Sequence, residues 1–403
     1  MDISDAMRAG VWNKQSTRVS LTVAYFAAFV GLGLTVGSLG PTLPGLAEQT
    51  QVGLSAISYL FTARSMGYVL GAVRGGKFFD ARPGNPAMAA MLLAMAVMMA
   101  LVPLATHLWL LLVVMIILGA AESALDVGAN TLLLWLHGNR VAPFMNAMHS
   151  FFGVGALIAP IVVAQTALFK YSTTHSYFVL ALLLLPIAAY MLRLPGPVPV
   201  AGAKPKETPI ANTRLVFLVA LFLFLYVGAE VGFAGWIFTY TIKLGLSEAS
   251  AAAYLTSLFW GSLTLGRVLA IPLTARFRPR PVLIYSLAGC LFSLALMLLS
   301  PRSFAAVLIG TIGLGLSMAS IFPTTLSFAG SQMKMTGRVT GWFVLGSSAG
   351  AMLIPLVIGQ AFQSLGPRIV IFVTTGTLLA AIGVLVALIR NSTAIENEVS
   401  AAV

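Results

Sequence analysis

The 403-residue chain is 59% hydrophobic and only 8% charged, and its mean hydropathy is +0.96. A soluble domain of this size needs far more charge to cover its surface, so the composition excludes the soluble class and indicates many membrane spans. The formal charge of +12 does not predict a nucleic-acid partner, because the basic residues are scattered between apolar segments without a groove-sized cluster. The single cysteine, Cys290, excludes a disulfide framework and a thiolate metal site.

Twelve apolar segments are long enough to cross a bilayer, which predicts an all-α membrane protein with twelve transmembrane helices. They lie at about 18–46, 52–76, 86–105, 108–136, 142–168, 174–193, 213–241, 249–274, 281–300, 303–329, 337–362 and 366–390. The only long polar connection, rich in proline and lysine, is 194–212. We therefore predict a six-helix half at 1–193, a cytoplasmic linker at 194–212 and a second half at 213–403.

The distribution of basic residues predicts the orientation. Eighteen of the 23 Lys and Arg residues, Arg267 among them, are assigned to the segments on the side of the termini, and four to the opposite loops. Since positive loops stay in the cytoplasm, both termini are expected there. The first 17 residues lack the features of a signal peptide, which favours a bacterial inner membrane as the location.

The two halves repeat each other at an offset of 195 residues. Gly33, Gly37 and Gly40 fall on Gly228, Gly232 and Gly235, and GALIAPIV from Gly155 falls on GAMLIPLV from Gly350. Two six-helix repeats are related by an axis along the membrane normal, and a substrate site is expected between them at mid-depth.

The stretch GAVRGGKFFDARPG, at 71–84, connects the second and third spans. It resembles the glycine–aspartate–arginine signature of the major facilitator superfamily, with Gly76 and Asp80 four apart and Arg82 one residue later than usual. The resemblance implies the twelve-helix major facilitator fold and a gating role for Asp80, Gly76 and Arg82. The second copy, from Gly266, has Ala275 in place of the aspartate.

Three carboxylates and one arginine lie within apolar spans. Glu122, Asp126 and the amide of Asn130 share one helical stripe in the fourth span, Glu230 lies in the seventh and Arg64 in the second. Placing a charged side chain at this depth of the bilayer costs roughly several kcal/mol of free energy unless the charge is paired, hydrated or bound to a cation. Two alternatives follow: a coupling site for a proton or for sodium at Asp126, Glu122 and Asn130, or a structural ion pair between Arg64 and an acid.

Polar and aromatic side chains suited to a sugar occur in both halves. A sugar needs hydrogen-bond partners for its hydroxyls and an aromatic face for its C–H side, within a mostly apolar pocket. The candidate residues are Asn130, Asn146 and His149 in the first half and Trp236, Tyr240, Trp260 and Trp342 in the second. For each of them a purely structural role between helices is the alternative.

Three stretches indicate a narrower group. LDVGANTLLLWLHG, MNAMHSFFGVGALIAP and FLFLYVGAEVGFAGWIFTY are similar to the sodium-dependent glucose transporter family and its bacterial relatives, which are close to the proton-coupled fucose permeases. Fucose permeases carry a glutamate where Glu122 stands and an aspartate on the first span, which here has only Thr35 and Ser38. The resemblance implies cation-coupled uptake of a hexose or related sugar.

Motifs of other functions are absent from the sequence. There is no GxxxxGK[ST] or HExxH, so neither ATP nor an embedded enzyme is expected, and no cofactor is predicted beyond the coupling ion. A proton-coupled exporter of drugs or metabolites is the main alternative, and a receptor without transport is the third. The fold requires no partner chain, so we expect a monomer in the lipid bilayer.

Overall fold

The computed structural model describes residues 15–80, 84–195, 212–333 and 335–401, which form helices and contain no strand. The helices of the first half are α2 (Gln15–Gln49), a single turn α3 (Leu54–Ile57), α4 (Tyr59–Asp80), α5 (Gly84–Leu101), α6 (Leu108–His137), α7 (Val141–Leu168) and α8 (Ser176–Leu192). Those of the second half are α9 (Thr213–Lys243), α10 (Ala249–Arg276), α11 (Pro279–Leu299), α12 (Phe304–Met318), α13 (Ile321–Gln332), α14 (Gly337–Leu365) and α15 (Ile369–Ala401).

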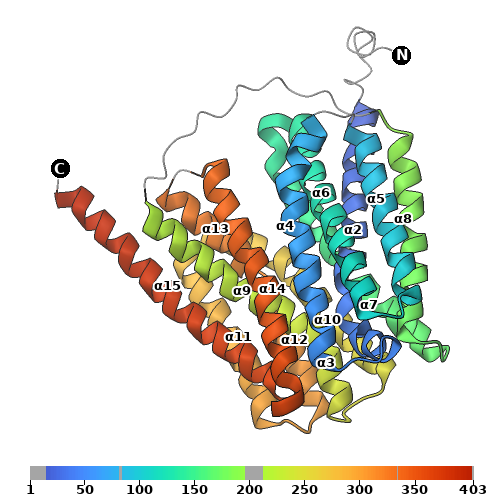
Figure 1. Ribbon diagram of the computed structural model, residues 1–403. Helices are drawn as coiled ribbons and strands as arrows, with labels where there is room; N and C mark the ends of the chain where they lie inside the picture. The colour runs from blue at the N-terminus through green and yellow to red at the C-terminus, as the bar shows by residue number, and fades with distance from the viewer. Residues whose placement is uncertain (1–14, 81–83, 196–211, 334, 402–403) are drawn as a thin grey trace.

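Eleven helical segments of the described residues are long and apolar enough to span a membrane. The twelfth span is α4, which carries more charge and lies alongside α6 in the bundle (Figure 1). The predicted all-α architecture is therefore confirmed. The predicted span at 303–329 corresponds to one candidate span, Phe304–Gln332, whose helix is interrupted by a turn at Ala319 and Ser320 between α12 and α13. Pro323 explains the break, since its ring clashes with the carbonyl four residues earlier and it has no N–H to donate.

The two halves repeat the same packing. In the first half α7 packs closely on α2, and a Cβ at Gly155 would lie 2.0 Å from the Val30 carbonyl oxygen. In the second half α14 packs on α9 in the same way, and a Cβ at Gly350 would lie 2.0 Å from the Phe224 carbonyl oxygen. Only glycine permits such an approach of two helix backbones. Gly155 and Gly350, which the 195-residue offset matches, therefore make equivalent contacts in the two halves.

The halves meet at one end of the bundle. We define the terminal end as the end where α2 and α9 begin, and the distal end as the opposite one. Near the distal end α2 crosses α9, and a Cβ at Gly40 would lie 3.0 Å from the Gly235 Cα. There the Gln360 side-chain nitrogen also donates to the Ser55 carbonyl oxygen at 2.8 Å. Between α7 and α10 the Ser257 hydroxyl donates to the Leu157 carbonyl oxygen at 2.7 Å.

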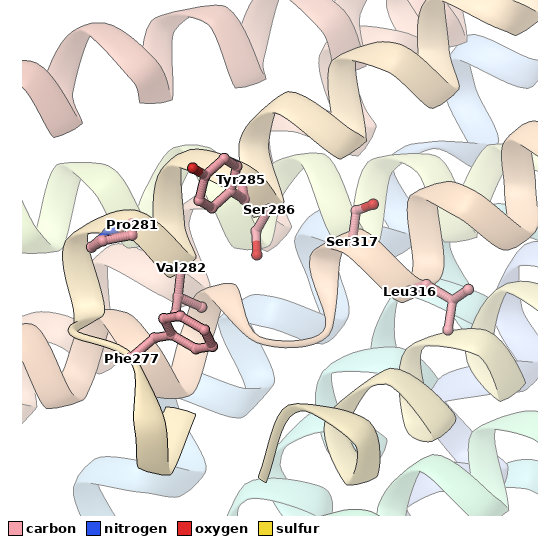
Figure 2. A pocket seen from close by; sticks show the side chains of 7 residues that line it. All are labelled: Phe277, Pro281, Val282, Tyr285, Ser286, Leu316 and Ser317. Atoms are coloured by element: carbon pink, nitrogen blue, oxygen red, sulfur yellow. The ribbon is translucent and has the colours of Figure 1, made fainter. Parts of the chain in front are cut away.

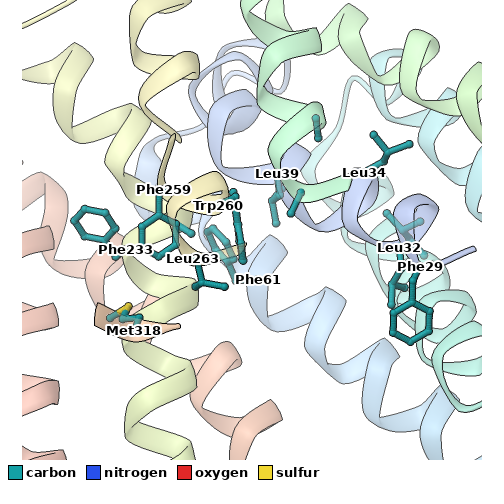
Figure 3. Close-up of a cluster of buried hydrophobic side chains, with 14 of the residues drawn as sticks. Phe29, Leu32, Leu34, Leu39, Phe61, Phe233, Phe259, Trp260, Leu263 and Met318 are labelled. Atoms are coloured by element: carbon teal, nitrogen blue, oxygen red, sulfur yellow. The ribbon is translucent and has the colours of Figure 1, made fainter. Parts of the chain in front are cut away.

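Aromatic side chains fill this contact between the halves. Trp236 of α9 is fully buried, stacks on Phe362 at 5.2 Å between ring centroids and lies 6.3 Å from Phe61 of α4. Deeper in the second half, Phe233 and Phe259 lie 5.2 Å apart within the buried cluster that Figure 3 draws. Packed rings therefore fill part of the contact between the halves near the distal end.

The terminal end is open by comparison. Asn146 and His149 on α7 are exposed, and Trp342 on α14 is 48% exposed. In Figure 1 the two halves lean apart toward this end. Side chains of α7 and α14 are therefore exposed toward this end.

Gly359 on α14 is expected to be required for distal closure. A Cβ there would lie 2.2 Å from the Ser58 Cβ and 2.8 Å from the Trp236 ring. We therefore expect Gly359→Ala to hold the distal end apart and to lower the yield of a cross-link formed there. Ser55 and Gln363 are in contact, with 3.3 Å between the Ser55 Oγ and the Gln363 Oε1. The yield of a disulfide between cysteines placed at these two positions therefore measures closure of the distal end.

The matched control is Gly376→Ala on α15, because a Cβ at Gly376 would meet nothing within 4 Å. The native Cys290 is buried and does not interfere with the assay. Equal disulfide yield in the Gly359→Ala and Gly376→Ala proteins would contradict the assignment.

Candidate functional site

Close packing of α4 against α6 positions the charged residues of the first half. A Cβ at Gly119 would lie 2.0 Å from the Arg64 carbonyl oxygen, and one at Gly67 would lie 2.0 Å from the Ile116 carbonyl oxygen. The two backbones are therefore nearly in contact. Side chains spaced by four residues on one helix then face those spaced by four on the other.

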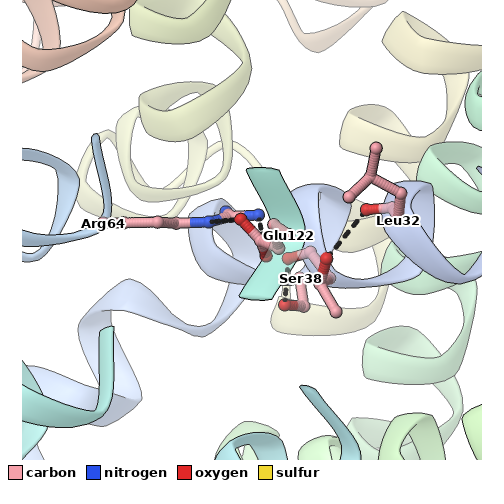
Figure 4. A network of polar contacts seen from close by, with 5 residues as sticks. Leu32, Ser38, Arg64 and Glu122 are labelled. Carbon is pink, nitrogen blue, oxygen red and sulfur yellow. Dashed lines mark hydrogen bonds and ion pairs between the residues drawn. The ribbon is translucent and has the colours of Figure 1, made fainter. Parts of the chain in front are cut away.

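Arg64 and Glu122 form a buried ion pair across this seam. The Arg64 Nε donates to one carboxylate oxygen at 2.9 Å and Nη2 to the other at 2.6 Å. The side chains are 12% and 2% exposed. Figure 4 shows the pair beside Ser38 of α2. Both charges are compensated in a bidentate geometry, which is the arrangement that makes a buried charge tolerable.

Asp126 lies one turn along α6 from Glu122 and has only neutral partners. The Tyr68 hydroxyl donates to one carboxylate oxygen in a short hydrogen bond, and the Asn130 side-chain nitrogen donates to the other at 2.8 Å. Among the described residues, Asp126 has no Lys, Arg or His within 4 Å. Its carboxyl group therefore accepts hydrogen bonds from two neutral side chains and makes no ion pair among the described residues.

The predicted sodium ligands do not converge in this conformation. Both Glu122 oxygens are bound to Arg64, and Asn130 directs its nitrogen at Asp126. Among the described residues, no three His, Cys, Asp or Glu side chains are grouped to hold a metal ion. Sodium at Asp126, Glu122 and Asn130 stays a prediction.

The second half has an acidic and a basic residue inside its membrane-spanning helices. Glu230 on α9 is buried, and Arg267 on α10 lies within electrostatic range of it. Within the part of the chain that the structure describes, neither makes an ion pair at 4 Å or less. Arg267, which was counted with the basic residues on the side of the termini, lies inside α10, well before that helix ends at Arg276.

His149 lies where the two halves begin to separate. Gly153 of α7 approaches Thr264 of α10 closely, and one turn nearer the terminal end the His149 side chain is exposed. The imidazole lies within electrostatic range of Asp126 in its own half and of Arg267 in the other. Asp126 and Arg267 are thus the charged groups, one from each half, that act electrostatically on His149.

The predicted aromatic residues occupy different positions. Trp260 on α10 is buried and meets Phe152 of α7 edge-on, with 6.2 Å between ring centroids. Trp236 belongs to the closed distal contact, where its indole nitrogen donates to the Pro355 carbonyl oxygen at 3.0 Å. Tyr240 is buried one turn further along α9, and Trp342 is exposed on α14. Among these four aromatic residues, Trp260 contacts α7, the helix that carries Asn146 and His149.

The other residues singled out in the sequence belong to the first half. Asn146 is exposed on α7, one turn from His149 toward the terminal end. Gly76 and Asp80 lie in the last turns of α4, while Arg82 lies outside the described residues. Thr35 and Ser38 donate their hydroxyls to carbonyls of their own helix.

Tyr68 and Arg267 were not identified as site residues from the sequence. A signal existed for both. Tyr68 follows Arg64 by four residues, as Asp126 follows Glu122, and Arg267 is a charged residue inside a predicted span. Both features point to the polar interior of a membrane bundle.

The sequence is similar to a known protein family and to individual members of it. The family model described as Major Facilitator Superfamily matches residues 21–343. The chain is 31% identical to sodium-dependent glucose transporter 1A of Mus musculus over 373 residues, covering 83% of this chain and 88% of that protein. It is 30% identical to sodium-dependent glucose transporter 1 of Homo sapiens, covering 83% of this chain and 72% of that protein.

Solved structures show the same fold at low sequence identity. A mutant of the nucleoside transporter NupG matches with a TM-score of 0.75 and 15% identity, covering 92% of this chain and 99% of that one. A bacterial homologue of the human lysosomal transporter Spinster, in an inward-facing and occupied conformation, matches with a TM-score of 0.64 and 13% identity over 94% of this chain and 95% of that one. This multi-pass membrane protein therefore belongs to the major facilitator superfamily of transporters and, within it, is a relative of the sodium-dependent glucose transporters.

Proposed function

We propose that this protein imports a hexose or related sugar together with sodium or a proton, by alternating access. The observation that carries the proposal is the uncompensated carboxylate of Asp126, held by Tyr68 and Asn130 next to the opening between the halves. The names of the relatives support a sugar as the substrate. With the termini in the cytoplasm of a bacterial inner membrane, the open terminal end would be the inward-facing side.

Coupling is proposed to depend on Asp126 first and on Glu230 second. Glu122 is already neutralised by Arg64, so those two residues serve to hold α4 and α6 together near the coupling site. Asp126 attracts a small cation because its present partners are neutral hydrogen-bond donors. A proton would bind a carboxylate oxygen directly, and sodium would need the oxygen ligands typical of hard cations after Asn130 turns its amide oxygen inward.

The sugar is proposed to bind between α6, α7 and α10. Asn130, Asn146 and His149 would bond its hydroxyls, and Trp260 would face its C–H side at the base of the opening. Trp236, Tyr240 and Trp342 would contribute when the halves rock and the distal end opens. Asp80, Gly76 and Arg82 are proposed to help lock one of the two states.

Uptake into proteoliposomes tests the proposal. Accumulation of a labelled hexose that requires an inward sodium or proton gradient is the expected result. Proton-driven loss of a lipophilic cation from the same vesicles would instead identify an exporter, and ligand binding without flux would identify a receptor. Either outcome would overturn the proposed import.

A further inference from the structure

A pocket opens between α11 and α12 on the outer side of the second half, away from the site between the halves. It has a volume of about 330 Å³, and Figure 2 shows several of its lining residues from α11 and α12. These include Phe277, Val282, Tyr285, Ser286, Leu316 and Ser317. The pocket lies at the terminal end, because α11 begins at Pro279.

The mouth of this pocket lies on the face of α11 that turns away from the protein. Tyr285 is 77% exposed, and Ile284, Phe292 and Leu299 are also exposed further along the helix. In a membrane-spanning bundle, exposed apolar side chains of this kind face the acyl chains of the bilayer. An exposed tyrosine near a helix end is typical of the headgroup level.

Two arginines lie on the segment leading into the pocket. Arg276 ends α10, Arg278 immediately precedes α11, and both side chains are exposed. Among the described residues, neither makes an ion pair within 4 Å. Arg280, by contrast, lies over the Phe328 ring at 5.9 Å. Two available guanidinium groups beside an apolar, lipid-facing pocket favour an anionic amphiphile.

We propose that this pocket binds an anionic phospholipid of the leaflet at the terminal end. The phosphate is held by Arg276 and Arg278, and one acyl chain enters the pocket against Phe277, Val282 and Leu316. The Ser286 hydroxyl on the pocket wall is hydrogen-bonded to the Ser320 hydroxyl at 2.8 Å, and the Ser317 hydroxyl is proposed to bond a glycerol ester carbonyl. Nothing in this assignment depends on which solute the protein transports.

Native mass spectrometry of the full chain in detergent tests the proposal, by titration with phosphatidylglycerol or phosphatidylcholine of equal chain length. We expect preferential binding of phosphatidylglycerol. The double variant Arg276→Gln/Arg278→Gln should bind it about 25-fold more weakly. The matched control is Arg302→Gln/Arg368→Gln, which removes two exposed arginines at the distal end and should leave the affinity unchanged.

A second variant distinguishes the contribution of the acyl chain to binding from that of the phosphate. Leu316→Trp fills the pocket and should weaken phosphatidylglycerol binding while Arg276 and Arg278 are intact. If inorganic phosphate displaces phosphatidylglycerol equally well from the unmodified protein and from the Leu316→Trp variant, the site binds free phosphate and the lipid assignment is wrong. Equal binding of the two lipids, or unchanged affinity in the double arginine variant, would also overturn it.

Discussion

Asp126→Asn is expected to abolish concentrative uptake of the transported sugar while leaving exchange across the membrane largely intact. The amide keeps the shape of the side chain and can still bond Tyr68 and Asn130, but it carries no charge to attract a coupling cation. Without coupling free energy the inside-to-outside sugar ratio should settle at about 1. Gradient-driven uptake and counterflow in proteoliposomes measure the two activities separately.

The matched control for this variant is Glu248→Gln, which removes one negative charge from an exposed position before α10. It should accumulate sugar as the unmodified protein does. If the Asp126→Asn protein still accumulates sugar against its gradient, Asp126 is not the coupling residue, and the same assay on Glu230→Gln decides whether the second half carries that role.

Breaking the ion pair between Arg64 and Glu122 is expected to be the most destabilising single change at the site. Removing either partner leaves the other charge buried and unpaired, which costs about 3–5 kcal/mol. Glu122→Ala and Arg64→Ala should therefore each lower the thermal unfolding temperature strongly in detergent. The double variant Arg64→Met/Glu122→Leu should recover most of the loss, because apolar residues of similar size need no counter-charge.

Transport by the double variant separates the two interpretations of this pair. A structural pair predicts that a folded double variant still accumulates sugar. Loss of accumulation in a protein of normal thermal stability would assign Glu122 or Arg64 a part in coupling. Unchanged stability in both single variants would show that the pair contributes little to the fold.

Much of the fold could be predicted from the sequence because membrane helices are set by local rules. Long apolar runs must form helices in lipid, and the 195-residue offset relates the two halves. The structure confirms both, through equivalent contacts of Gly155 and Gly350. The break before Pro323 was missed because hydropathy registers length and apolarity but not the lost hydrogen bond of a proline.

The candidate site was predicted less completely, because pairing depends on how helices are packed. Spacing placed Glu122 and Asp126 on one stripe, but it could not decide which of them Arg64 would neutralise. That choice follows from the close approach of Gly119 to Arg64, which fixes the register of α4 against α6. Burial of Trp236 in the distal contact likewise depends on Phe61 and Phe362, which come from helices distant in the sequence.

The interruption between α12 and α13 has a consequence for how the work is divided between the halves. At the 195-residue offset, Ala319 and Ser320 correspond to Ala124 and Leu125, which lie between Glu122 and Asp126 on the continuous helix α6. Asp126, the proposed coupling residue, thus lies on a continuous helix, whereas the matching element of the second half is interrupted. We expect the conformational change between the two open states to occur mainly by bending at Ala319 and Ser320. The geometry around Asp126 on α6 would then stay nearly constant during alternating access.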